Sequence, residues 1–169
     1  MPRHQLDRAD LVPKPVSRRL REAILKPILA WPYLEIGLAY WIGFALGVRA
    51  SEAAILIGAM DTRNKIDKLR ALYVHRKDKE AVALLKEITK EHGEHVKIRN
   101  TIAHAMLMGS SREDPDCAYF LTSRADPHEH GFMVVSRYSI SSFEAAEEFA
   151  LSRSMDICNL LRARGVEVE

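Results

Sequence analysis

The sequence predicts an all-α fold, an up-and-down helical bundle of four to five helices with a small β-hairpin inserted before the last helix. Three observations support this class. Apolar residues recur at helical spacing up to about Met108. Two short segments with strand propensity then follow a turn-rich loop. The final segment returns to the helical period. With 169 residues, 47% of them hydrophobic, the chain is long enough for one domain with a sizeable core.

The N-terminal part of the chain divides at its prolines. Residues 1–13 are expected to form a flexible leader, and residues 14–169 a single helical domain. Pro15 is suited to the first turn of a helix, and Pro27 predicts the end of that helix. A second helix is expected from Trp31 to Val48.

The apolar segment Ile28–Val48 is long enough to span a bilayer. It contains Glu35, and a charged residue in hydrocarbon costs roughly 2.5 to 3.5 kcal/mol. Pro32 lies near one end, and three glycines weaken a solitary helix. The segment is therefore interpreted as a buried central helix, and no membrane partner is expected.

The middle of the chain predicts two more helices. Apolar residues at helical spacing indicate a third helix over Ala50–Arg76. Asp78 then has the position of an N-cap, and the fourth helix is expected to run to about Met108.

The remaining elements follow the turn-rich loop "GSSREDPD". The segments "CAYFLTS" and "GFMVVSR" predict a β-hairpin at about residues 116–137. Ser141 and Glu144 have the spacing of a capping box, which predicts the start of a last helix that ends near Gly165.

The overall composition excludes few classes of function. The formal net charge is +2, so no basic tail marks a nucleic-acid-binding protein. The two cysteines, Cys117 and Cys158, lack the spacing of a metal or redox motif. The polar, proline-bearing N-terminus has no signal-peptide pattern, and a reduced cytoplasmic protein is expected.

The stretch "KIRNTIAHAM" of the fourth helix carries polar residues among apolar ones. The apolar stripe that starts at Ala81 and Leu85 passes through Arg99, which places this arginine near the middle of the apolar face. A buried arginine needs a partner, so the position indicates a cleft or an interface. Asn100 and His104 are four residues apart at the border of this face.

These three side chains can act together on one small volume. The guanidinium of Arg99 can hold a phosphate, His104 can transfer protons near neutral pH, and Asn100 can orient a neighbour. Such a set can cleave a phosphodiester without a metal. Arg99, Asn100 and His104 are therefore the candidate catalytic residues, and His95 and Lys97 are candidate substrate-binding residues.

Two other interpretations stay open. Arg99 could pair with a buried carboxylate, Glu35 or Asp61, and His104 could be a core histidine. A second Arg-Asn pair, Arg63 and Asn64, lacks a following histidine, so half of the pattern arises easily.

A metal-binding site at His92 and His95 is a further possibility. His92 and His95 are three residues apart, but the helix supplies no clear third ligand for a metal ion. His128 and His130 could act as ligands only if folding brought them close to this pair. No metal and no cofactor are expected.

The sequence "RNTIAH", Arg99–His104, resembles the signature motif of HEPN domains: an arginine, a polar residue that is often asparagine, three further residues, and a histidine. The resemblance implies a helical bundle that forms a homodimer, with the motifs of both subunits facing one cleft. It further implies metal-independent cleavage of RNA by the 2′-hydroxyl, with Arg99 and His104 as the catalytic pair and Asn100 in support. Many HEPN proteins are toxins or anti-phage effectors controlled by an antitoxin or other regulatory protein. Others are non-catalytic modules for dimerisation or for binding nucleotides or proteins, which is the alternative here.

Overall fold

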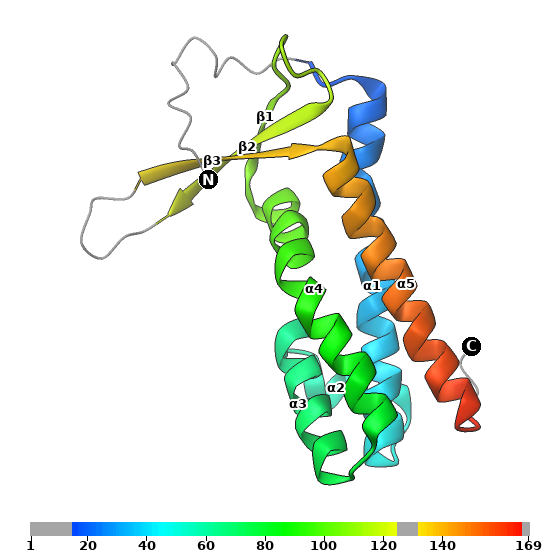
Figure 1. Ribbon diagram of the computed structural model, residues 1–169. Coiled ribbons are helices and arrows are strands. Elements are labelled where there is room, and N and C mark those ends of the chain that lie inside the picture. The colour runs from blue at the N-terminus through cyan, green and yellow to red at the C-terminus, as the bar shows by residue number, and fades with distance from the viewer. Residues whose placement is uncertain (1–14, 125–131, 167–169) are drawn as a thin grey trace. The chain divides into compact units, whose positions relative to one another are not determined.

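The computed structural model describes residues 15–124 and 132–166. The predicted leader and the turn of the predicted hairpin lie outside these residues. Within them the chain forms five helices and a three-stranded antiparallel sheet, which precedes the last helix (Figure 1). The predicted class, a helical bundle with a small β insertion before the last helix, is confirmed.

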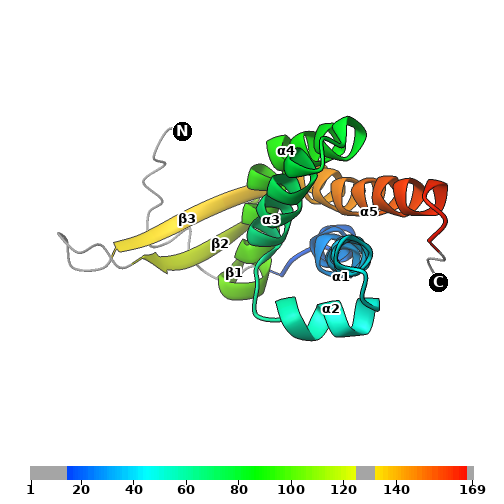
Figure 2. The same cartoon turned by 90° about the horizontal axis from the view of Figure 1, so that it is seen from below.

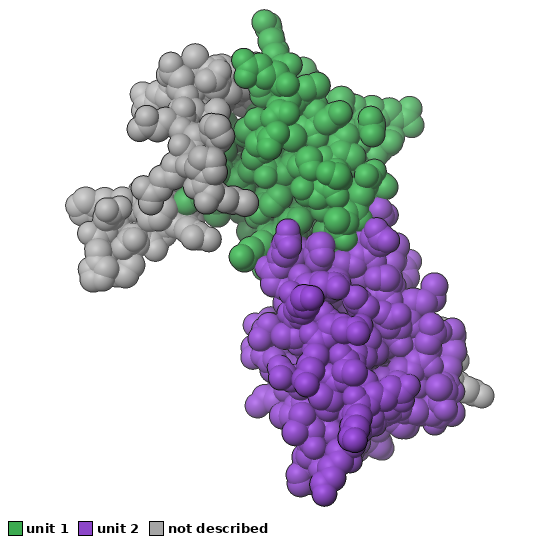
Figure 3. Space-filling model, viewed as in Figure 1, with its two compact units in different colours: residues 1–29, 97–146 green, residues 30–96, 147–169 purple. Residues whose placement is uncertain are grey.

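The chain divides into two compact units (Figure 3). Unit 1 comprises residues 1–29 and 97–146, and unit 2 comprises residues 30–96 and 147–169. Three helices contribute to both units: α1 (Arg18–Leu46), α4 (Lys79–His104) and α5 (Ile140–Ala163). Unit 2 also holds α2 (Ala50–Ile57) and α3 (Thr62–His75), and unit 1 holds the strands β1 (Met106–Gly109), β2 (Cys117–Arg124) and β3 (Phe132–Ser139). The single domain expected over residues 14–169 stays a prediction.

Helix α1 is continuous where two helices were expected. The prediction that Pro27 ends a helix is wrong, because α1 runs through both Pro27 and Pro32. A proline inside a helix costs about 3 kcal/mol. Buried apolar side chains on both sides of Pro27, among them Ile24 and Trp31, stabilise the helical path, and Pro27 itself is buried.

The predicted third helix is in fact two helices. Helix α2 ends at Ile57, and the backbone N–H of Met60 bonds to the Ile57 carbonyl in a turn. The Asp61 side chain then caps α3 by accepting from the backbone N–H of Asn64 at 2.7 Å. The capping aspartate specifies a new helix start, which overrides the apolar periodicity that predicted one helix.

The fourth helix begins as predicted and ends earlier than predicted. Asp78 accepts from the backbone N–H of Ala81 at 3.0 Å, as its N-cap position predicts. Helix α4 ends at His104, whereas it was expected to continue to about Met108. Residues Met106–Gly109 instead form β1, because they pair with β2 in antiparallel register.

The predicted hairpin is confirmed as β2 and β3, with Cys117 opposite Ser139 and Leu121 opposite Val135. The sheet order is β1-β2-β3, so β1 adds a third strand. The start of α5 differs from the predicted capping box. The helix begins at Ile140, and the Ser139 hydroxyl, rather than that of Ser141, accepts from a backbone N–H, that of Ser142.

Each unit has its own apolar core. In unit 2, α1 lies beside α2 and α5 (Figure 2), and the core side chains with no or almost no exposure include Leu34, Leu38, Trp41, Ile66, Leu69, Leu85, Ile88 and Ile157. In unit 1 the helix ends pack on one face of the sheet, and the core comprises Leu20, Ala23, Ile24, Ile98, Ala118, Phe120, Ile140, Phe143 and Ala146.

One described helix, α1, is long and apolar enough to cross a membrane by length and composition. Half of its 18-residue apolar window is buried inside the protein. The core helix of a soluble protein meets the same two criteria, so this property is weak support for a membrane span.

Candidate functional site

The candidate catalytic residues Arg99, Asn100 and His104 lie in the last two turns of α4, in unit 1. Ile98 is only 5% exposed and belongs to the core of this unit, and Ile102 packs against that core. These two isoleucines fix the rotation of the helix end. Arg99 is consequently half-buried at the edge of the apolar face, not at its centre as expected, while Asn100 and His104 are exposed.

Arg99 is held by its neighbour. Its Nη1 donates to Oδ1 of Asn100 at 3.0 Å. Its Nε is shielded from solvent and has no acceptor among the described residues. An arginine offers five N–H donors in a planar fork, so this side chain keeps capacity for a further acceptor, such as a phosphate oxygen.

The carboxylates considered as partners of Arg99 have other partners. The Glu35 carboxylate pairs with the Lys65 ammonium and accepts from the Thr62 hydroxyl. Asp61 is the N-cap of α3. The structure thus gives no support to a buried ion pair between Arg99 and either carboxylate.

His104 is the last residue of α4 and is exposed. The interpretation of His104 as a core histidine is therefore wrong. It follows Asn100 by one helical turn, so both side chains lie on the same side of the helix. No hydrogen bond joins His104 to Arg99 or Asn100 in the described structure. The imidazole is accessible to a ligand.

A tyrosine of the sheet lies next to Thr101 of the motif. The Tyr138 hydroxyl lies 3.4 Å from the Thr101 hydroxyl, and its ring packs against Phe120 and Phe143 at centroid distances of 6.2 and 6.1 Å. The motif pattern in the sequence does not include Tyr138. Strand alternation was the available signal, because it places Tyr138 on the face of β3 whose β2 partner is Ala118, a core residue.

The two candidate substrate-binding residues have different surroundings. Lys97 is exposed in unit 1. His95 belongs to unit 2, where its ring stacks on Phe149 at a centroid distance of 4.7 Å, and its Nδ1 is shielded without an acceptor in the described chain. Burial lowers the pKa of His95. The structure favours a packing role for His95, and its role in binding stays a prediction.

His92 is a buried histidine of unit 2, with 3% of its surface exposed. Its ring lies 5.9 Å from Trp31, and its Nε2 is shielded without a described partner. Burial, and next the charge of Arg63, lowers the pKa of His92. The described residues include no group of three or more histidine, cysteine, aspartate or glutamate side chains that could hold a metal ion. His128 and His130 lie outside those residues.

Comparison of the chain with protein-family models, with curated proteins and with solved structures gave no match. The resemblance to HEPN domains therefore depends on the motif Arg99–His104 and on its place near the end of a long helix.

Proposed function

We propose that the protein is a metal-independent endoribonuclease of the HEPN type that works as a homodimer. The observation that supports this most is the state of the motif. An arginine with unused donors is held by an asparagine, and an exposed histidine follows one turn later. Nothing in the described packing of unit 1 uses the exposed imidazole, which is what a residue that acts on a ligand requires.

In the proposed reaction the 2′-hydroxyl of a ribose attacks the adjacent phosphorus. The bond from phosphorus to the 5′-oxygen breaks, which leaves a 2′,3′-cyclic phosphate and a 5′-hydroxyl. His104 takes the proton from the 2′-hydroxyl or gives one to the leaving oxygen. Because each step needs its own proton carrier, His104 of a second copy supplies the other transfer. Arg99, held by Asn100, stabilises the charge that develops on the phosphorane oxygens.

The biological role belongs to the same proposal. A ribonuclease without a metal requirement acts on cytoplasmic RNA as soon as it folds, so a cell needs a means to restrain it. We therefore propose a toxin or anti-phage effector whose activity an antitoxin or another regulatory protein controls.

The test is RNA cleavage by the purified full-length protein in EDTA, with a single-stranded RNA as substrate. We expect 2′,3′-cyclic phosphate ends, and no cleavage where the ribose is replaced by 2′-deoxyribose. His104→Ala should lower the rate by about 100-fold or more, which is the usual contribution of a general acid or base. Arg99→Ala should lower it by about 100- to 1000-fold.

The chain supplies matched controls. His75 is an exposed histidine in the last turn of α3, as His104 is in α4, so His75→Ala should keep full activity. Arg63→Ala is the matched control for Arg99→Ala, because Arg63 belongs to the other Arg-Asn pair. The guanidinium of Arg63 binds Asp67 rather than the neighbouring asparagine. Equal cleavage by wild type and His104→Ala, or no cleavage of several RNAs by the wild type, would contradict the proposal.

A second candidate is a non-catalytic module that uses the same bundle for dimerisation or ligand binding. The net charge of +2 favours it, because a nuclease needs phosphate-binding surface beyond one arginine. In that case Arg99→Ala weakens ligand or partner binding while neither wild type nor variant cleaves RNA.

A further inference from the structure

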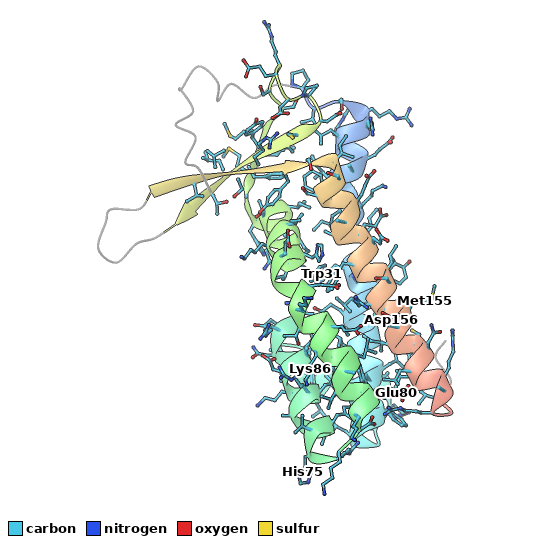
Figure 4. The ribbon with its side chains drawn as sticks, in the orientation of Figure 1. Trp31, His75, Glu80, Lys86, Met155 and Asp156 are labelled. Atoms are coloured by element: carbon cyan, nitrogen blue, oxygen red, sulfur yellow. The ribbon has the colours of Figure 1, made fainter. Side chains whose placement is uncertain are left out.

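Helix α1 carries an exposed arginine, Arg21, on the side of unit 1 that faces away from α5. Leu20 and Ile24 of α1 belong to the core of this unit. The first turns of α1 and α5 lie side by side (Figure 4), and the Lys26 ammonium is 3.8 Å from the Glu144 carboxylate of α5. Lys26 therefore marks the side of α1 that faces α5. Arg21 precedes Lys26 by five residues, which places it about 140° from Lys26 around the helix, at the other edge of the buried face.

Arg99 has the corresponding position on α4. Ile98 belongs to the same core as Leu20 and Ile24. The Thr101 hydroxyl lies 3.4 Å from the hydroxyl of Tyr138, whose ring packs against Phe143 in the first turn of α5. Thr101 therefore marks the side of α4 that faces the start of α5. Arg99 lies about 160° from Thr101 around the helix, on the side away from α5.

The two arginines thus share one side of unit 1. Ile24 of α1 and Ile98 of α4 pack in one core, and α5 closes this core from the other side. Arg21 is one helical turn from Ile24, and Arg99 directly follows Ile98. Both guanidinium groups are therefore placed to reach one ligand along the edge where α1 and α4 adjoin.

Neither arginine pairs with a carboxylate in the part of the chain that the structure describes. Glu22, next to Arg21 in the sequence, binds Arg18 at 2.7 Å. Arg99 donates to Asn100, and its Nε is shielded without an acceptor among the described residues. Two neighbouring positive groups without a carboxylate favour an anion, and a phosphate accepts two parallel bonds from each guanidinium.

We propose that Arg21 is a substrate-binding residue, which holds a second phosphate of the RNA strand beside the phosphate that Arg99 stabilises. This inference rests on the proposed function, because it takes RNA as the ligand of the motif. Arg21 supplies the phosphate-binding surface beyond one arginine that a nuclease needs. The second phosphate keeps its charge during the reaction, so Arg21 contributes to substrate binding and not to the chemical step.

RNA affinity tests the inference without any need for cleavage. The probe is a fluorescein-labelled hexanucleotide with 2′-O-methyl riboses, which cannot form a cyclic phosphate. In the full-length protein, Arg21→Gln should raise Kd about tenfold, as expected for the loss of a charge-assisted hydrogen bond. The slope of log Kd against log salt concentration should decrease by about 0.7, because one phosphate contact to a single strand is lost.

Arg19→Gln is the matched control. Arg19 is also exposed on α1 and has no ion pair with a described residue, but it precedes Lys26 by seven residues and so lies on the side of α5. This substitution removes the same charge and should change Kd less than about twofold if the position of Arg21 matters. Equal effects of the two substitutions, an unchanged Kd in Arg21→Gln, or a wild type that does not bind the probe would overturn the inference.

Cleavage kinetics separate a failure of this inference from a failure of the proposed function. With an unmodified hexanucleotide, Arg21→Gln should raise KM about tenfold and keep kcat. With a dinucleoside monophosphate, which has a single phosphate, Arg21→Gln and wild type should have equal kcat/KM. A lower kcat with unchanged KM would overturn the inference and leave the proposed function in place. A wild type that binds RNA through Arg21 but cleaves none would contradict the proposed function and still support the binding role of Arg21.

Discussion

Four polar side chains of unit 2 meet near Trp31. The Trp31 indole N–H donates to the Thr62 hydroxyl at 3.4 Å, and this hydroxyl donates to Glu35. Glu35 pairs with Lys65, so each of these polar groups has a partner. His92 lies against the same indole, and its Nε2 has no partner among the described residues. A proton on this nitrogen would therefore be buried without a hydrogen-bond acceptor, whereas the other polar groups of the cluster have partners.

We expect this histidine to make the stability of the protein depend on pH. Burial lowers the pKa of His92, and of the charges around it Arg63 lowers it further while Glu35, Asp61 and Asp67 oppose this. Below the ordinary value of about 6.5 the unfolded chain takes up a proton that the folded chain refuses. Stability is thus fully present above that pH and is lost as pH falls below it, at up to about 1.4 kcal/mol per pH unit.

Urea unfolding at pH 7.5 and pH 5.5 measures this effect. His92→Leu should show a smaller loss of unfolding free energy between the two pH values than wild type does. Part of the loss should remain in His92→Leu, because burial also lowers the pKa of His95. His75→Gln, at an exposed position, is the control and should behave as wild type. An equal loss in His92→Leu and wild type would assign the pH dependence to other groups.

At the scale of elements, two glycines in helices have opposite surroundings. A Cβ on Gly43 of α1 would lie 2.9 Å from the Val48 carbonyl oxygen and 3.3 Å from Ala50 Cα, where the chain turns into α2. A Cβ on Gly93 of α4 meets nothing within 4 Å. We expect Gly43→Ala to destabilise the protein by about 1–3 kcal/mol, since backbone atoms must move. Gly93→Ala should stabilise it by roughly 0.5–1 kcal/mol, because alanine is the better helix former.

Thermal or urea unfolding of the two variants checks both signs in one experiment. They serve as controls for each other, because each changes one helical glycine to alanine. A loss of stability in Gly93→Ala would mean that residues around α4 are closer than the structure places them. A neutral Gly43→Ala would mean that the turn between α1 and α2 adjusts at no cost.

The elements also show which signals in the sequence are sufficient to predict a helix start or a strand. Asp78 was identified as a cap because it precedes a long amphipathic run, and the strands β2 and β3 were identified by their β-branched and aromatic residues. Pro27 and Asp61 were misjudged for a common reason. Burial around Pro27 outweighs a local helix breaker, and at Asp61 a local cap outweighs an apolar period that continues beyond it.

The site was predictable only in part for a related reason. A helical wheel drawn from Ala81 assigns Arg99 to the buried face, but α4 packs in two cores, and in unit 1 the buried residue is Ile98. The elements that pack against α4 in unit 1 decide that Ile98, and not its neighbour Arg99, faces the core. Likewise β1 depends on pairing with Leu121 and Phe120, residues that are distant in the sequence.

At the scale of the whole molecule, the helices α1, α4 and α5 each contribute to both units. The candidate catalytic residues Arg99, Asn100 and His104 all belong to unit 1. The proposed reaction needs two copies of this unit, because it uses one histidine for each of two proton transfers.

Mixed dimers test whether two copies share one reaction site. The proposed reaction uses His104 of both copies, so a dimer with a single His104 should be inactive. We expect wild type that is unfolded and refolded in an equal mixture with His104→Ala to keep about a quarter of the activity of the same total amount of wild type alone. Half of the dimers are then mixed and hold one His104, and only the quarter that holds two is active.

The control is an equal mixture of wild type and His75→Ala, which should keep full activity because His75 is exposed in α3, outside the motif. Native mass spectrometry establishes that mixed dimers are present. Half of the wild-type activity in the His104→Ala mixture would mean that Arg99 and His104 of the same chain act together without a second copy. In that case the bond from Arg99 to Asn100, which turns the guanidinium toward the side of His104, is the feature that joins the two residues in one site.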